Sequence, residues 1–269
     1  MHPKFSEFLA YVKVSRPPLL LMGLLGPLAC LKWVNGFSDP LKAGLMLIAI
    51  FTGNLAWNWI NELEDEDVDR VNKPWKPVPS GQINTLGLSV ASICLLLISM
   101  VSIMLLSYHY GIFYLLIGGL AHVTACIYNV KRRDLFGNIC EVVTIALAPL
   151  MVMYPYNLQF PLQLGLLFFG IALITQLQDV EAEKVKGILT APQQLGKSRT
   201  HLIASVSLWF STLIGVYRFE WFILPFVISA LSNSVAVLLV DEKIDSIEWF
   251  SRRLGRAFIL IGFICMLLF

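Results

Sequence analysis

Apolar residues fill nine long stretches of the chain, and polar or charged residues separate one stretch from the next. The stretches cover approximately residues 17–36, 42–61, 86–107, 110–130, 136–154, 161–178, 199–217, 221–240 and 254–269. Most have about the 20 residues that a helix needs to cross a bilayer. Lipid offers the backbone no hydrogen bonds, so spanning segments are expected to be helical. The pattern predicts an all-α, polytopic membrane protein with nine transmembrane helices in a single domain, residues 1–269.

The composition agrees with this class of protein. Hydrophobic residues make up 57% of the chain and charged residues 14%, and the mean hydropathy is +0.72. A soluble domain has about a quarter charged residues. The five cysteines are scattered through apolar stretches without a CxxC pair, so we expect them to act as small buried hydrophobes. A lipid bilayer is therefore the expected environment of the protein, and nucleic acid is not an expected partner.

Basic residues are distributed very unevenly over the predicted connections. With a cytoplasmic N-terminus, all but three of the 20 Lys and Arg residues fall on the cytoplasmic side. Only Lys32, Lys42 and Arg218 fall on the other side. Cytoplasmic loops are enriched in Lys and Arg. The asymmetry predicts a cytoplasmic N-terminus and, for nine spans, a C-terminus on the opposite side.

Half of the 18 acidic residues lie in two short windows, residues 62–69 and 179–183, at the ends of the second and sixth apolar stretches. Both windows fall on the predicted cytoplasmic face. Carboxylates are costly near a bilayer, so their concentration there points to a function. Hard oxygen ligands bind divalent cations and, through them, phosphate. A solvated, acidic helix end is the alternative interpretation.

Spacing within the first window favours a metal site. Asn61, Asp65 and Asp69 are four residues apart, so a continuing helix would place them on one face. Mg2+ commonly takes one or two carboxylates from a protein and completes its shell with water and substrate phosphates. The other acids of this window are expected to point elsewhere, either solvated or outside the ligand set. They are Glu62, Glu64, Glu66 and Asp67.

A basic, proline-rich segment follows the first window. Arg70, Lys73 and Lys76 are interleaved with three prolines at 74, 77 and 79. Proline cannot occupy a helix interior, so the segment is predicted to form a stiff turn. Basic side chains directly beyond a metal site are placed to neutralise a diphosphate.

The segment NELEDEDVDRVNKPWKPVPSG resembles the first aspartate-rich motif of the UbiA superfamily of intramembrane prenyltransferases. That motif is close to N-D-x-x-D-x-x-x-D-R-x-N-x-P-x-R-P-x-P-S-G. Ten residues fall in register: Asn61, Asp65, Asp69, Arg70, Asn72, Pro74, Pro77, Pro79, Ser80 and Gly81. Two residues depart from it: Glu62 stands in place of Asp, and Lys76 in place of Arg. Lys is a point charge rather than a planar fork, so contact with phosphate there is looser.

Four further elements are similar to family patterns. The second acidic window has Asp179, Glu181 and, in place of the last Asp, Glu183. Tyr128 and Lys131 match a Y-x-x-K element, for which an ordinary positive-inside anchor is the alternative. Arg16 stands before Pro17 as in the family's N-terminal Arg-Pro. Gly137-Asn138 also resembles the branch that makes archaeal lipids.

The resemblance implies a ring of nine helices around a central cavity, capped on the cytoplasmic side by the loops after helices 2 and 6. It implies Mg2+-dependent transfer of a polyprenyl group from an allylic prenyl diphosphate to a hydrophobic or amphipathic acceptor. The acceptor would be a geranylgeranylglyceryl phosphate-like lipid or an aromatic ring. Two Mg2+ ions would be held by Asn61, Asp65, Asp69, Asp179 and Glu183, of which the four acids are catalytic. The substrate-binding residues would be Arg16, Asn58, Asn61, Arg70, Lys73, Lys76, Tyr128 and Lys131.

Two other functions remain open. A UbiA-like terpene cyclase needs the same diphosphate chemistry, but the substrate's own double bonds capture the cation. A cation transporter fits less well, because its carboxylates should lie near the middle of the membrane. Here both acidic windows lie at the ends of apolar stretches.

Overall fold

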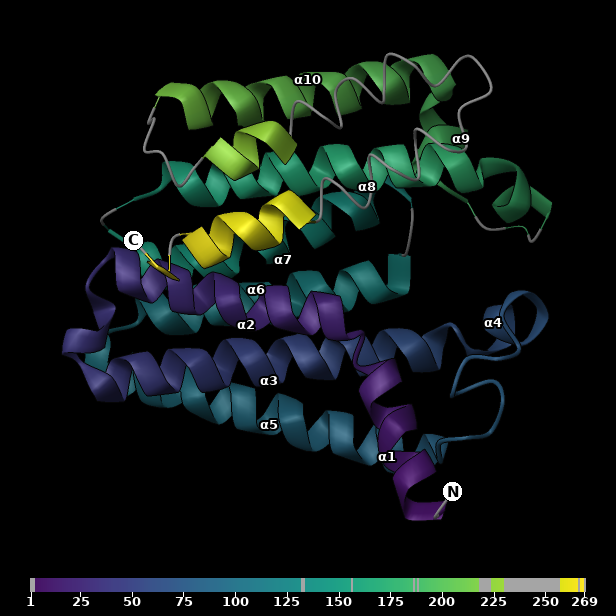
Figure 1. Ribbon diagram of the computed structural model, residues 1–269, viewed down its shortest axis with the longest axis horizontal. Helices are drawn as coiled ribbons and strands as arrows, with labels where there is room; N and C mark the ends of the chain where they lie inside the picture. Colours follow the sequence, from purple (N-terminus) through teal and green to yellow (C-terminus); the bar gives the residue numbers. More distant parts are fainter. Residues whose placement is uncertain are drawn as a thin grey trace. The chain divides into compact units, whose positions relative to one another are not determined.

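The computed structural model describes residues 3–131, 134–155, 157–185, 187, 189–217, 224–229, 257–265 and 267–268, and these residues contain helices but no strand. Its labelled elements are α1 (Pro3–Val14), α2 (Pro17–Trp33), the short 3₁₀ helix η1 (Gly36–Ser38), α3 (Pro40–Glu64), α4 (Glu66–Asn72), α5 (Thr85–Tyr110), α6 (Phe113–Lys131), α7 (Leu135–Met153), α8 (Gln159–Val185), α9 (Ala191–Leu195) and α10 (Lys197–Tyr217) (Figure 1). Residues 224–229 and 257–265 are also helical.

Within the described part of the chain, five helical segments are long and apolar enough to cross a membrane. They are Pro40–Glu64, Thr85–Tyr110, Phe113–Lys131, Leu135–Met153 and Gln159–Leu177. A shorter apolar helix runs from Leu20 to Trp33. These segments coincide with the first six predicted stretches, and the seventh forms α10. Most of the eighth stretch and parts of the ninth lie outside the described residues, so the number of nine spans stays a prediction.

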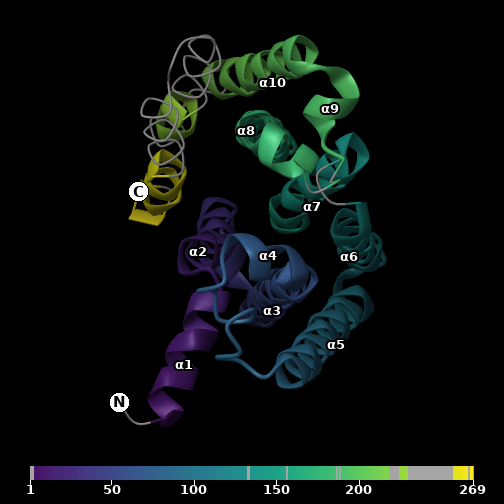
Figure 2. The same ribbon diagram turned by 90° about the vertical axis from the view of Figure 1, so that its right-hand side faces the viewer.

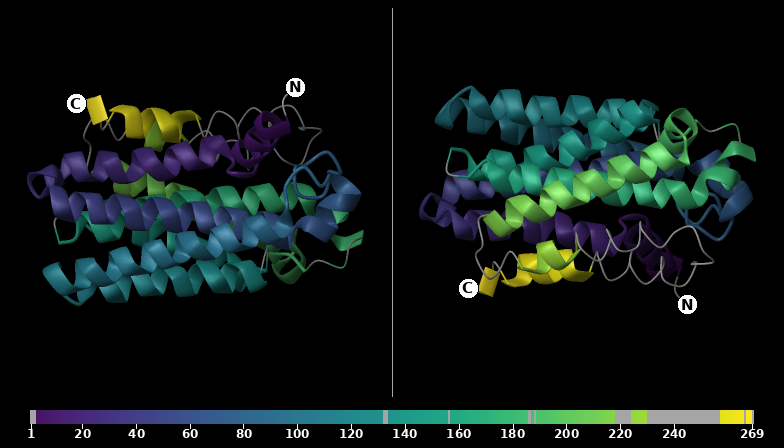
Figure 3. Two further views of the ribbon diagram at one scale, coloured as in Figure 1. Left: turned by 90° about the horizontal axis from the view of Figure 1, so that it is seen from below. Right: turned by 90° about the horizontal axis from the view of Figure 1, so that it is seen from above.

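The first compact unit comprises Met1–Leu28 and Gly36–Gly119. Its most extensive helix packing is between α3 and α5, which run alongside one another (Figure 3). The buried hydroxyl of Ser99 donates to the backbone carbonyl of Ala49 at 2.7 Å, and small side chains at this crossing let the helices approach closely. α3 begins at an Asp39 N-cap, whose carboxylate accepts from the backbone N–H of Lys42 at 3.0 Å. This bond lowers the pKa of Asp39.

A small hydrophobic cluster lies at the other end of α3. Residues from α1, the loop after α4 and the start of α5 form it: Ala10, Val14, Val78, Ile83 and Leu88, with Tyr11, Trp59 and Leu63 packed against them. The sequence pattern did not predict α1, which is short and precedes the first apolar stretch. The cluster joins the N-terminal helix to the segment that carries the proline-rich loop.

The second compact unit comprises Ala29–Asn35 and Leu120–Phe269. Within it α8 packs against both α7 and α10 (Figure 2). A Cβ at Gly170 of α8 would lie 2.5 Å from Leu208 of α10, so glycine is needed for this close approach. The buried hydroxyl of Ser211 donates to the carbonyl of Gln163 at 3.0 Å. α8 is thus held on two sides before it reaches the second acidic window.

Candidate functional site

The first acidic window lies at the junction between α3 and α4. Asp65 is the residue between the two helices, with φ −80° and ψ −5°. Its N–H donates to the carbonyl of Asn61 at 3.0 Å, and the N–H of Asp69 donates to the carbonyl of Asp65 at 2.8 Å. Asn61, Asp65 and Asp69 are therefore linked by one-turn hydrogen bonds, but the single helix expected to continue through them is interrupted at Asp65, where α3 ends and α4 begins. Their position on one common face stays a prediction.

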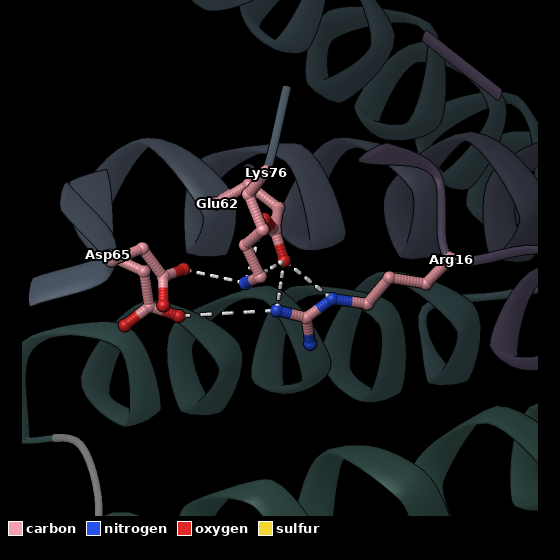
Figure 4. A network of polar contacts seen from close by, with 5 residues as sticks. Arg16, Glu62, Asp65 and Lys76 are labelled. Carbon is pink, nitrogen blue, oxygen red and sulfur yellow. Dashed lines mark hydrogen bonds and ion pairs between the residues drawn. The ribbon is translucent and has the colours of Figure 1, made fainter. Parts of the chain in front are cut away.

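Glu62 is buried and binds two basic side chains. Its carboxylate is only 4% exposed. Nε of Arg16 donates to Oε1 at 2.7 Å, and a second guanidinium nitrogen of Arg16 also contacts Oε1. Nζ of Lys76 lies 3.1 Å from Oε2 and 3.3 Å from Oε1. Figure 4 shows both basic side chains converging on Glu62. Of the two expectations for Glu62, the solvated one is wrong, because Arg16 from the α1–α2 junction and Lys76 from the loop after α4 cover this face of α3. The other, a position outside the ligand set, stays a prediction.

Lys76 extends the same network to Asp69. Its Nζ lies 2.6 Å from Oδ2 of Asp69, whose side chain is 6% exposed. Asp65 stands further off, with 3.9 Å between its Oδ2 and the guanidinium of Arg16. We call Arg16, Glu62, Asp65, Asp69 and Lys76 the α3-end network. With three carboxylates and two cations it carries a net charge of −1, which favours binding of a further cation.

Arg16 is held in place by the junction between α1 and α2. Its backbone has φ 49°, in the left-handed region that residues other than glycine rarely adopt. The preceding Ser15 accepts a hydrogen bond from Nε1 of Trp59 at 3.0 Å. Trp59 and Glu62 are three residues apart on α3, so one face of that helix holds both Ser15 and Arg16. Tyr11 packs on the ring of Trp59, with 5.9 Å between the centroids.

Lys76 is positioned by the proline-rich loop, which forms a series of turns between α4 and α5 as predicted. The carbonyl of Lys76 accepts from the N–H of Ser80 at 3.0 Å. Gly81 has φ 71°, which glycine adopts at no steric cost. Val78 and Ile83 anchor the loop in the hydrophobic cluster. The lysine therefore extends from a fixed turn rather than from a free loop.

Three other predicted residues of this unit lie outside the network. Arg70 pairs with Glu66 on the exposed side of α4, with 2.6 Å between Nη2 and Oε1. That hydrogen bond raises the pKa of Arg70. Lys73 is exposed at the end of α4. Asn58 is buried one turn before Glu62 and donates to Asn54 at 3.1 Å.

In the second unit, Tyr128 and Lys131 lie in the last turn of α6. Tyr128 is half-buried and Lys131 is exposed. The backbone of α7 approaches this end closely, since a Cβ at Gly137 would lie 2.4 Å from the carbonyl oxygen of Lys131. Asn138 follows, and its side chain exchanges hydrogen bonds with Gln176 of α8. Gly137-Asn138 thus connects the end of α6 to α8.

Asp179 and Glu183 lie in the last turns of α8, which continues to Val185. A helix places residues four apart on one face, so the backbone keeps the predicted arrangement. Their side chains, like that of Glu181, lie outside the described part of the structure. Their role as ligands of a second Mg2+ therefore stays a prediction.

The first window has donor atoms that fit Mg2+. Among the described side chains, no three Asp, Glu, His or Cys residues converge into a metal-binding group. Mg2+, however, needs only one or two carboxylates from a protein. Asp65 and Asp69 supply oxygen donors one turn apart, with Asn61 one turn before them. A cation at Asp69 would share that carboxylate with Lys76.

Sequence reasoning missed two residues of these sites, Glu62 and Gln176. Glu62 did carry a signal: it departs from the usual motif together with Lys76, and the two bind one another. Gln176 had only the weaker signal of an amide inside an apolar stretch.

Known sequences similar to this chain point to one family. The pattern of the UbiA prenyltransferase family matches residues 19–262. Digeranylgeranylglyceryl phosphate synthase of Pyrococcus abyssi is 27% identical over 246 residues, which cover 88% of this chain and 85% of the relative. The enzyme of that name from Thermococcus kodakarensis is 27% identical over 208 residues, 74% of each chain.

Solved structures share the fold. A structure of digeranylgeranylglyceryl phosphate synthase has a TM-score of 0.73 at 20% identity, covering 97% of this chain and 98% of that one. A UbiA homolog from Archaeoglobus fulgidus bound to GPP and Mg2+ has a TM-score of 0.63 at 18% identity, covering 96% of this chain and 99% of that one.

Proposed function

The chain belongs to the UbiA prenyltransferase family and is an integral membrane prenyltransferase, and from this premise we propose the reaction that it catalyses. It transfers a polyprenyl group from an allylic prenyl diphosphate to a membrane-associated acceptor, with Mg2+ as cofactor. The α3-end network carries this proposal, because it gathers carboxylates and cations at the end of an apolar helix. Residues 1–269 form one catalytic domain in this proposal.

Mg2+ would be held by Asn61, Asp65 and Asp69 at the first window, and a second ion by Asp179 and Glu183. When bound, these ions neutralise the negative charge that develops on the departing diphosphate. The GPP- and Mg2+-bound homolog from Archaeoglobus fulgidus supports this choice of cofactor.

The basic residues bind and orient the diphosphate. Arg16 and Lys76 lie in the α3-end network, and Arg70, Lys73 and Lys131 supply further positive charge. The allylic carbon–oxygen bond breaks with its electron pair leaving on the diphosphate, and fixed positive charge stabilises that leaving group. The acceptor then donates an electron pair to the allylic carbon and loses a proton. Surrounding apolar helices exclude water, which would otherwise capture the cation.

A geranylgeranylglyceryl phosphate-like lipid is the acceptor that we propose, in preference to an aromatic ring. The similarity to digeranylgeranylglyceryl phosphate synthases supports it. Both acidic windows and the N-terminus are cytoplasmic in this proposal, and the C-terminus is on the opposite side. The distribution of Lys and Arg supports this orientation.

Assays of the purified protein with Mg2+ test the proposal. Geranylgeranyl diphosphate is supplied alone, with geranylgeranylglyceryl phosphate, or with an aromatic acceptor such as 4-hydroxybenzoate. A lipid product with two prenyl chains is expected only in the second assay. A prenylated ring in the third would change the acceptor, and a cyclic hydrocarbon in the first would establish a terpene cyclase instead.

A further inference from the structure

We propose that Glu62 is a positioning residue of the prenyl diphosphate site. Its buried carboxylate gathers Arg16 and Lys76 and presents the two cations together at the end of α3. This inference rests on the proposed function, which assigns both cations to the diphosphate. The inference adds a role in diphosphate binding for Glu62, although its own negative charge would repel the diphosphate.

The geometry requires an anion between the two cations. Arg16 comes from the junction between α1 and α2, and Lys76 from the loop after α4, 60 residues further along the chain. Both contact the same atom, Oε1 of Glu62, with Nε of Arg16 at 2.7 Å and Nζ of Lys76 at 3.3 Å. Two cations this close repel one another unless a negative charge lies between them. Glu62 supplies that charge from the rigid last turns of α3.

The burial of Glu62 makes the contact strong. A carboxylate that is 4% exposed is costly unless it is paired and hydrogen-bonded. Here both oxygens have cationic partners. The backbone of Arg16, with φ 49°, is in a conformation that costs free energy for a residue with a Cβ. Its guanidinium contact with Glu62 helps to hold it there, next to the bond of Ser15 with Trp59.

Replacement of Glu62 by Gln distinguishes a positioning role from a simple electrostatic one, because the two roles predict opposite changes in the affinity for prenyl diphosphate. If Glu62 acts only as a nearby negative charge, its removal strengthens binding of an anionic diphosphate. If it is only a buried structural group, its removal lowers stability but leaves affinity in the folded protein unchanged. A positioning role predicts weaker binding, because Arg16 and Lys76 lose the anion that holds them.

The experiment measures binding of geranyl diphosphate to the purified full-length protein by titration calorimetry in saturating Mg2+. We expect Glu62→Gln to weaken binding by about 10-fold or more, the loss of a charge-assisted hydrogen bond. Glu62→Asp keeps the negative charge and should retain most of the wild-type affinity for geranyl diphosphate. Glu64→Gln, the same change two residues away on the exposed side of α3, should bind like the wild type.

Equal or tighter binding by a folded Glu62→Gln protein would overturn the inference while leaving the proposed function intact. A wild-type protein that binds neither geranyl nor geranylgeranyl diphosphate would overturn both. Should Glu62→Gln not fold, the pair Glu62→Asp and Lys76→Arg decides. Both changes restore residues that the family motif usually carries. If the two side chains act through their contact, the double variant should bind geranyl diphosphate more tightly than the sum of the two single losses in binding free energy predicts. Additive losses in binding free energy would contradict positioning through this contact.

Discussion

The side-chain amides of Asn138 and Gln176 bond to one another twice. Nδ2 of Asn138 donates to Oε1 of Gln176 at 3.1 Å, and Nε2 of Gln176 donates to Oδ1 of Asn138 at 2.8 Å. Both residues are buried. The pair joins α7 to α8 one turn before Asp179, so it sets the position of the helix that carries the second acidic window.

We expect removal of this pair to destabilise the fold and to show strong coupling. Interhelical hydrogen bonds in membranes contribute about 0.6 kcal/mol on average and up to about 1.7 kcal/mol. Asn138→Ala and Gln176→Ala should each lower the free energy of unfolding. Together they should cost less than the sum of the two single losses, because each single change already removes both hydrogen bonds between the two amides. Denaturant unfolding of the four proteins in a double-mutant cycle measures this, and strictly additive losses would show that the two amides do not depend on one another.

Local spacing explains what the sequence could predict. The one-turn intervals of Asn61, Asp65 and Asp69 and the turn of the proline-rich loop follow from residues close in the chain. Two acidic motifs at membrane exits also led to the correct family. The intervals and the turn depend on helix geometry and proline stereochemistry, which act over a few residues, whereas the family was identified from the resemblance of the two acidic motifs to a known pattern.

Non-local packing explains what the sequence could not predict. Glu62 is buried because Arg16, 46 residues earlier, and Lys76, 14 residues later, reach it. Nothing in the spacing of the first window shows which acids meet these cations. The helix α1 was missed for a similar reason, since its stability depends on packing against Val78 and Ile83 of a later loop rather than on an apolar stretch of its own.

The next prediction concerns the proposed metal ligands. Asp65→Ala, Asp69→Ala and Asp179→Ala should each lower turnover at least about 100-fold, the scale of losing one electrostatic stabiliser of a transition state. Glu64→Ala, in an exposed position of the same acidic stretch, should retain activity. Prenyl transfer is assayed with Mg2+ and again in excess EDTA. Undiminished turnover in EDTA would rule out the metal assignment.

Lys76 should compete with a divalent cation for Asp69. Its ammonium lies 2.6 Å from Oδ2 of that carboxylate, so a metal binding there must share the oxygens or displace the lysine. Lys76→Gln should therefore strengthen Mn2+ binding by about 10-fold in the absence of diphosphate, while it weakens binding of prenyl diphosphate. Electron paramagnetic resonance of free Mn2+ measures the first effect. Lys13→Gln, which removes an exposed charge at the end of α1, is the control. Weaker Mn2+ binding by Lys76→Gln would contradict the competition.

The role of Lys131 can be separated from that of an ordinary membrane anchor. Lys131 is exposed in the last turn of α6, beside the close approach of Gly137 to its carbonyl. If it binds diphosphate, Lys131→Ala should raise the KM for prenyl diphosphate by about 10-fold, roughly the 1.5–3 kcal/mol of a charge-assisted hydrogen bond. Lys131→Arg should keep much of the activity, because the charge remains.

Lys197 provides the matched comparison. It is also an exposed lysine at a helix end and is predicted to lie on the same side of the membrane, but it belongs to none of the elements assigned to the diphosphate. An anchor role depends only on the number of positive charges near the membrane, so it predicts equal effects for Lys131→Ala and Lys197→Ala. A diphosphate role predicts a raised KM for Lys131→Ala alone. Steady-state kinetics of the two variants, with thermal unfolding to verify that both are folded, decides between the two roles.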